Sequence, residues 1–251
     1  MRSSNPALSD KIFDSYTMPQ SSQDVMTING VVNKCVIMLI LLIIPATYVW
    51  KTFFGAETLD QGLDIASKLT LIGVVGSLIL AVITIFKKRW SPITAPAYAA
   101  VEGLALGGVS SIMEAKFPGI VIQATALTFG TLFALLMAYR SGLIKVTENF
   151  KLGIVAATGG IFLIYIISFV LRFFGTEIPY IHESGLIGIG FSLFVVVIAA
   201  LNLVLDFDFI EKGAERGAEK FMEWYAAFGL IITLAWLYFE ILSLLSKLRS
   251  R

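Results

Sequence analysis

Carboxylates inside long apolar runs are the residues of this sequence best suited to chemistry. Asp206 and Asp208 end one such run, Glu240 lies near the end of another, and Glu102 lies in a segment rich in small residues. A carboxylate in hydrocarbon is costly unless it faces a polar interior or another polar group, so these acids are functional candidates. Two carboxylates in a site of low dielectric constant cannot both ionise cheaply, so they titrate jointly and can sense protons. When unprotonated, such a pair is also a hard oxygen site of the kind that Ca²⁺ prefers.

Depth in the membrane limits which of these acids can meet. At 1.5 Å per residue, Glu102 is expected roughly 10 Å inside the face from which Asp206 lies about one helical turn. These two acids are therefore expected at compatible depths. Glu240 follows Trp224 by sixteen positions, so a straight helix would carry it most of the way across. A direct contact with Asp206 is strained unless this helix begins outside the hydrocarbon or is strongly tilted.

The simpler interpretation of each acid is that it marks the membrane boundary, where carboxylates near helix ends cost little. This interpretation fits Asp208 and Glu223 best. We retain Asp206, Glu240 and Glu102 as candidates for proton sensing and gating, with Asp208 as a secondary candidate. Asp206 and Glu240 are also the candidate ligands for a transient Ca²⁺ ion.

The composition identifies an integral membrane protein. Of the 251 residues, 57% are hydrophobic and 15% are charged, and the mean hydropathy is +0.84, which is far more apolar than a soluble domain. The formal net charge of +1 argues against nucleic-acid binding, which needs a concentrated excess of Lys and Arg. We therefore expect the lipid bilayer to be the main partner.

Seven apolar segments predict an all-α protein with seven transmembrane helices, because each segment can cross a hydrocarbon core of about 30 Å. The first segment can do so only if Asn33 and Lys34 reach toward the interface. We expect a polar cytoplasmic tail at residues 1–30, the transmembrane domain at 31–246 and a basic tail at 247–251. The segments are Cys35–Trp50, Leu69–Phe86, Ser91–Met113, Phe117–Tyr139, Leu152–Leu171, Ser184–Leu205 and Trp224–Leu245.

The basic residues predict the orientation. Lys and Arg gather at 87–89, 140–151 and 212–220, and all three clusters are cytoplasmic if the amino terminus is cytoplasmic. The charged stretch 211–220 is expected to be a solvated helical extension or loop. The basic carboxyl-terminal tail does not follow this pattern, so the last segment either spans fully, which we favour, or is re-entrant.

Several function classes lack their sequence signatures. His182 has no second His or Cys nearby, which disfavours a zinc site, and no Ser-His-Asp arrangement is recognisable. The chain lacks a G-x-x-x-x-G-K-[ST] sequence for ATP and a mid-span lysine for a retinal Schiff base. We therefore expect neither an enzyme nor a resident cofactor.

Three stretches resemble the Bax inhibitor-1-like membrane proteins, particularly a bacterial branch: SSNPALSD (3–10), SPITAPAYAAVEGLALGGVSS (91–111) and LNLVLDFDFIEKGAERGAEKFMEWYAAFGLIITLAWLYFEIL (201–242). The resemblance implies six helices around a central seventh, a pH-sensitive leak of Ca²⁺ or other cations, and location in the bacterial cytoplasmic membrane. Asp206 matches an acidic residue at the end of the family's sixth helix. Glu240 stands where the family has an aspartate in the seventh helix, and Glu102 resembles a glutamate of the third helix and is an alternative partner.

The leading functional hypothesis is a passive, proton-regulated cation leak channel, most plausibly for Ca²⁺. A different hypothesis is a non-conducting regulatory partner of a membrane protease or quality-control complex, which would use the amino-terminal tail and the charged stretch 211–220. A secondary transporter is disfavoured because no clear repeat relates the two halves. The spacing of Gly103 and Gly107 further predicts close approach of another helix backbone.

Overall fold

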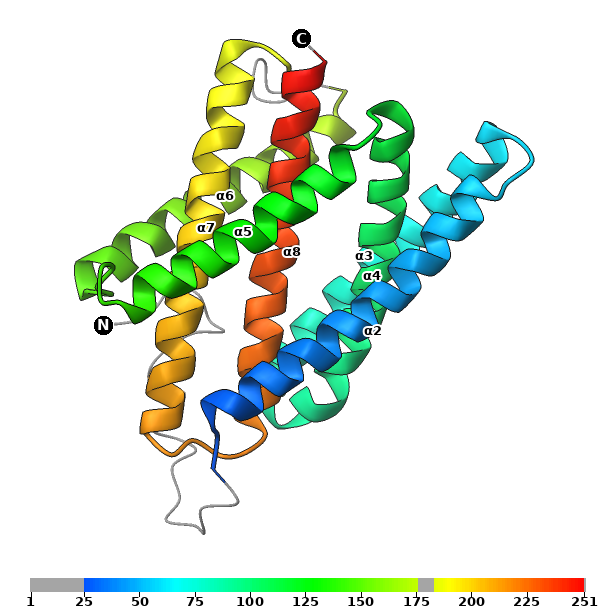
Figure 1. The fold of residues 1–251 in the computed structure, drawn as a ribbon. Helices are drawn as coiled ribbons and strands as arrows, with labels where there is room; N and C mark the ends of the chain where they lie inside the picture. The colour runs from blue at the N-terminus through cyan, green and yellow to red at the C-terminus, as the bar shows by residue number, and fades with distance from the viewer. Residues whose placement is uncertain (1–24, 176–182, 251) are drawn as a thin grey trace. The chain divides into compact units, whose positions relative to one another are not determined.

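The computed structural model describes residues 25–175 and 183–250, and in these ranges the chain is helical with seven long α-helices (Figure 1). The all-α prediction is confirmed. The helices are α2 (Ile28–Phe54), α3 (Leu59–Phe86), α4 (Ser91–Lys116), α5 (Ile120–Arg140), α6 (Glu148–Phe173), α7 (Leu186–Glu215) and α8 (Met222–Arg249), with the short 3₁₀ helix η1 (Lys88–Trp90) before α4. Most of the predicted amino-terminal tail, and His182, lie outside the described residues.

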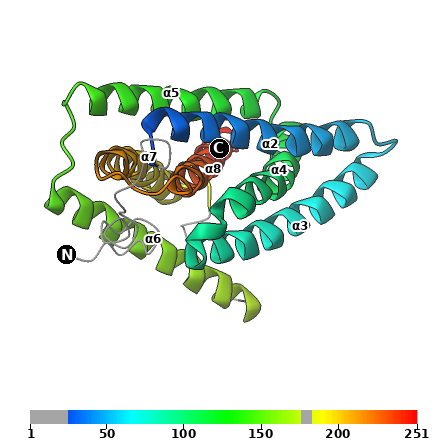
Figure 2. The same ribbon diagram turned by 90° about the horizontal axis from the view of Figure 1, so that it is seen from below.

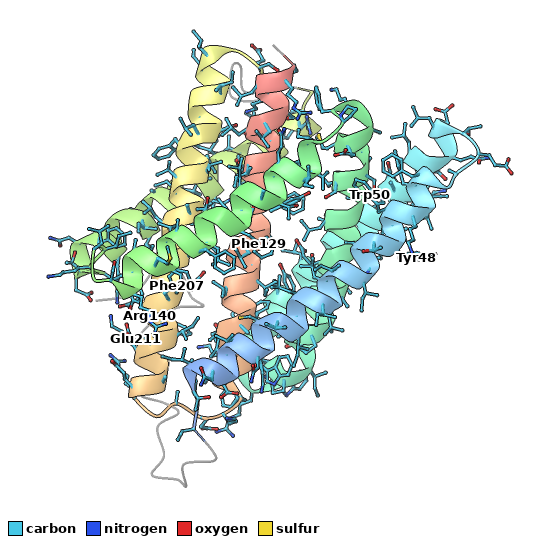
Figure 3. All side chains as sticks on the ribbon, in the orientation of Figure 1. Tyr48, Trp50, Phe129, Arg140, Phe207 and Glu211 are labelled. Carbon is cyan, nitrogen blue, oxygen red and sulfur yellow. The ribbon has the colours of Figure 1, made fainter. Side chains whose placement is uncertain are left out.

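Six of these helices are long and apolar enough to cross a membrane, and α4 is the exception. At 1.5 Å per residue, even the 21 residues of α5 reach about 30 Å. Large apolar side chains are left uncovered on many of them, such as Leu78 at 64% and Ile122 at 73% exposure. Tyr48, labelled in Figure 3, is likewise exposed on α2. The chain is therefore an integral, multi-pass membrane protein that places these side chains in lipid.

Most helices extend beyond the predicted spans at one end or both, because flanking polar residues continue the helix. Instead of a long polar connection over residues 51–68, only residues 55–58 separate α2 from α3. The Thr58 side chain caps α3 by accepting a hydrogen bond from Gln61 N, as a threonine at this position commonly does. At the carboxyl end, α8 is one unbroken helix to Arg249, which favours the full span over the re-entrant alternative.

The chain divides into two compact units. Among the described residues, the amino-terminal unit holds 25–118 and 209–232, and the carboxy-terminal unit holds 119–208 and 233–250. Both α7 and α8 contribute to each unit. The arrangement of six helices around a seventh remains a prediction.

In the amino-terminal unit, α4 packs against α2 and α3 (Figures 1 and 2). Glycines on α4 make this packing close, as their spacing predicted. A Cβ atom at Gly107 would lie 2.7 Å from Ala46 Cα, and one at Gly103 would collide with the backbone oxygen of Leu42. The α4 backbone therefore approaches α2 at positions where only hydrogen fits.

The carboxy-terminal unit is built around apolar contacts among α6, α7 and α8. Ile161, Val195 and Ile198 form a buried cluster that packs against partly buried side chains including Tyr165 and Trp236. This cluster fixes the facing surfaces of the three helices. The polar side chains described next lie on those surfaces.

Candidate functional site

Asp206 is buried in the carboxy-terminal unit, two residues before the point at which α7 passes into the amino-terminal unit. Its side chain is buried, with 2% exposure. Both carboxylate oxygens are enclosed, and neither has a hydrogen bond of ordinary geometry to any described residue. Thr233 on α8 is the neighbouring polar side chain. A buried carboxylate with a single hydroxyl as its neighbouring donor gains strongly from a proton or a cation, because one hydroxyl does not offset its lost hydration.

Asp208, two residues further, is in a different environment. Lys151 on α6 lies 2.9 Å from its carboxylate, and the same ammonium lies 3.8 Å from Glu148. Phe207, between the two aspartates and labelled in Figure 3, packs its ring 5.9 Å from that of Tyr139. The two aspartates thus differ as successive faces of a helix should, and the charge of Asp208 is balanced.

Glu240 is another buried acid of this unit, and it has donors of its own. The hydroxyl of Tyr165 on α6 donates to Glu240 Oε1 at 2.8 Å, and Trp236 Nε1 donates to the same oxygen at 3.1 Å. The Tyr165 bond holds the carboxylate against α6, and the two bonds together satisfy the hydrogen-bonding capacity of one of its oxygens.

The structure does not pair Asp206 with Glu240. Asp206 neighbours Thr233, and Glu240 follows Thr233 by seven residues, about 10 Å along α8. Seven residues are close to two turns, so Thr233 and Glu240 share one face of α8. The two acids lie along one helix pair at different levels, which agrees with the strain expected for their direct contact.

The same register continues to the end of α8. Lys247, seven residues beyond Glu240, donates through Nζ to Ser192 Oγ on α7 at 2.8 Å. Fourteen residues separate Ser192 from Asp206 and Lys247 from Thr233, so the helices run antiparallel in constant register over about 21 Å. We call this series, formed by Asp206, Thr233, Glu240, Ser192 and Lys247, the α7–α8 polar file.

Glu102 is buried in the amino-terminal unit, on α4. Its polar neighbours are Ser77 on α3 and Tyr98 one turn earlier on α4. Glu102 therefore has its own surroundings within the α2–α3–α4 packing. Its pairing with Asp206 remains a prediction.

The profile of the family described as Bax inhibitor 1 like matches residues 5–250, nearly the whole chain. The chain belongs to the Bax inhibitor 1 like family. No curated protein and no solved structure matches the chain. Membership confirms the resemblance seen in the sequence and fits the multi-pass helical fold.

In this member of the Bax inhibitor 1 like family, Glu223 forms a polar cluster that the sequence analysis missed. Its side chain is fully buried and accepts hydrogen bonds from the backbone N–H and the hydroxyl of Thr27, at 3.1 and 3.0 Å. Lys220 Nζ lies 2.9 Å and Lys34 Nζ 3.4 Å from its carboxylate. Gly30 leaves the space that this carboxylate occupies. Glu223 thus fastens the start of α2 to the start of α8.

The α7–α8 connection has further attachments within the amino-terminal unit. Val25 forms an antiparallel bridge with Glu219, and Arg89 lies 3.2 Å from the Glu219 carboxylate. Lys88, in η1, places its ammonium 5.7 Å from the ring centroid of Tyr225, and partial burial lowers the pKa of this lysine. The predicted helical extension continues α7 as far as Glu215. The rest of the charged stretch is a connection fixed in place by the contacts of Glu219.

No group of three or more His, Cys, Asp or Glu side chains gathers to hold a metal ion in the part of the chain that the structure describes. Asp206 and Glu240 could each offer carboxylate oxygens to a passing hard cation. Their different levels along the α7–α8 pair would make these two successive contacts.

Proposed function

We propose that this chain is a passive, pH-sensitive leak pathway for cations, with Ca²⁺ the foremost candidate. The observation that carries the proposal is the burial of both Asp206 carboxylate oxygens, with the Thr233 hydroxyl as their neighbouring polar group. A permanently ionised carboxylate would be costly there, whereas a bound proton or cation would offset the buried charge. Exchange between the two would make cation binding at Asp206 depend on pH.

The α7–α8 polar file supports a route for the ion. Thr233 and Glu240 recur on one face of α8, and Asp206 and Ser192 lie at matching levels on α7. Hydroxyl and carboxylate oxygens replace part of the hydration shell of a hard cation. A cation would meet Asp206 and Glu240 in sequence, which favours passage over retention.

Asp206 is the proposed proton sensor of this pathway. When protonated, the Asp206 carboxyl group carries no charge and attracts a cation only weakly. When ionised, it attracts a cation strongly. Flux should therefore change with pH across the interval in which this carboxylate titrates. Tyr165 and Trp236 already donate to Glu240, which assigns that acid to ion contact more than to gating.

Purified protein in sealed liposomes tests the proposal. Ca²⁺ flux down its gradient should appear without ATP or any partner protein, and should vary over about pH 5 to 8, where a buried carboxylate can titrate. Silent vesicles made from folded protein would contradict the channel and favour the alternative function, a non-conducting partner of a membrane protease or quality-control complex.

The proposed location is a bacterial cytoplasmic membrane, as the resemblance to a bacterial branch of the family implies. The proposed orientation has the amino terminus in the cytoplasm, which the basic clusters in alternate connections support. In a Cys35→Ser background, single cysteines at exposed Lys87 and exposed Ser141 should label only from the cytoplasmic side. Labelling of the Ser141 position from outside would reverse the assignment.

A further inference from the structure

Lys247 places a positive charge at the end of the α7–α8 polar file where α8 ends and α7 begins. Its ammonium donates to Ser192 Oγ at 2.8 Å and to the backbone oxygen of Gly188 at 3.2 Å. Both acceptors lie in the first two turns of α7, and Ser192 is buried. The side chain is therefore held between two helices, where lysines of transmembrane helix ends would otherwise extend to the interface.

The positive charge of Lys247 affects the nearest carboxylate of the polar file. Lys247 interacts electrostatically with Glu240, which precedes it by two turns on the same face of α8, roughly 10 Å away along the axis. Glu240 is the carboxylate that an ion would meet first when it enters from this end. The ammonium thus lies between this end of the polar file and the oxygens that would attract that ion, about two helical turns from them.

The neighbouring basic residue of α8 faces elsewhere. Arg249 donates through Nη2 to Gln123 Oε1 on α5 at 2.9 Å, away from Ser192 and Gly188. Arg249 therefore serves as a matched control, because it is a cation on the same terminal turns of the same helix.

We infer that Lys247 is a tethered cation that limits entry of permeating cations into the α7–α8 polar file, and so keeps the pathway a slow leak. The inference rests on the proposed function and names its rate-limiting charge. Repulsion between unit charges 10 Å apart, at the effective dielectric constant of about 20 that describes protein sites, corresponds to roughly a tenfold effect on ion occupancy. The effect is larger for a divalent ion.

Liposome flux of full-length variants tests this role. Lys247→Gln can still hydrogen-bond to Ser192 but lacks the charge, so K⁺ flux should rise by roughly tenfold and Ca²⁺ flux by more. Lys247→Arg should stay near wild type, and Arg249→Gln should change flux less than about twofold, since its charge faces α5. Lys247→Met removes the charge in a second way and serves if the glutamine variant fails to fold.

The outcomes separate this inference from the proposed function. If wild type conducts and neither Lys247→Gln nor Lys247→Met, when folded, exceeds its flux, the barrier role is wrong and the leak pathway stands. An equal rise in Arg249→Gln would mean that charge loss anywhere on the last turns suffices, and would also overturn the inference. Vesicles silent with wild type and every folded variant would overturn both.

Discussion

Lys151 lies 2.9 Å from Asp208, so α6 balances the charge of the aspartate that does not enter the polar file. Asp208→Asn should therefore leave the pH dependence of flux in place. It should lower the stability of the detergent-solubilised protein by about 1–3 kcal/mol, because the partly buried ammonium of Lys151 loses its closest carboxylate. Thermal unfolding and flux on the same preparation check both parts. Loss of the pH response in this variant would move the sensor to Asp208.

The separation of Glu240 from Asp206 predicts distinct phenotypes for the two acids. Glu240→Gln should reduce cation flux and retain a sigmoidal pH response, with a midpoint shift of about one pH unit or less, as expected for charges roughly 10 Å apart. Flux measured over the full pH range provides the test. A flat profile in Glu240→Gln would mean that the two acids titrate as one unit after all.

Close packing between α4 and α2 predicts a strong effect of one methyl group. Gly107→Ala would place Cβ 2.7 Å from Ala46 Cα, so the variant should lose about 1–3 kcal/mol of stability. Gly130→Ala, in α5, meets nothing within 4 Å and should be neutral or slightly stabilising, because alanine favours helix. Comparable melting temperatures for the two variants would show that the helices can separate without cost.

The buried Glu223 cluster predicts a stability effect at the start of α2. Glu223→Gln keeps the shape but removes the charge that Lys220 and Lys34 share, at an expected cost of about 1–3 kcal/mol. The control is Glu219→Gln, which removes a more exposed pair with Arg89 worth about 0–1 kcal/mol. If melting temperatures fall equally, the cluster does not hold α2 more firmly than a surface ion pair would.

Local apolar runs predicted the helices, because crossing a hydrocarbon core requires a long stretch of such residues. The same reasoning made Asp206 a candidate for proton sensing, since its neighbours along the chain are apolar. It failed for Glu223, whose partner Thr27 lies 196 residues away. Hydrophobicity near a helix end cannot distinguish a boundary acid from one held by a distant segment.

The reach of Lys247 to Ser192 was also unpredictable from the sequence. It depends on the antiparallel register of α7 and α8, which side-chain packing sets within the carboxy-terminal unit. For Glu240, the spacing from Trp224 predicted a different level from that of Asp206, and the register of α7 and α8 is consistent with this prediction. Its donors Tyr165 and Trp236 became visible only in the packed unit.

The central claim is that Asp206 is the titrating residue of a cation pathway, and Ca²⁺ flux through wild type and Asp206→Asn in liposomes tests it most directly. Asparagine keeps the shape and removes the titration. Over about pH 5 to 8, wild-type flux should change with pH, and the folded Asp206→Asn variant should give a flat profile. A wild-type flux independent of pH, or an Asp206→Asn profile that follows wild type, would contradict the account.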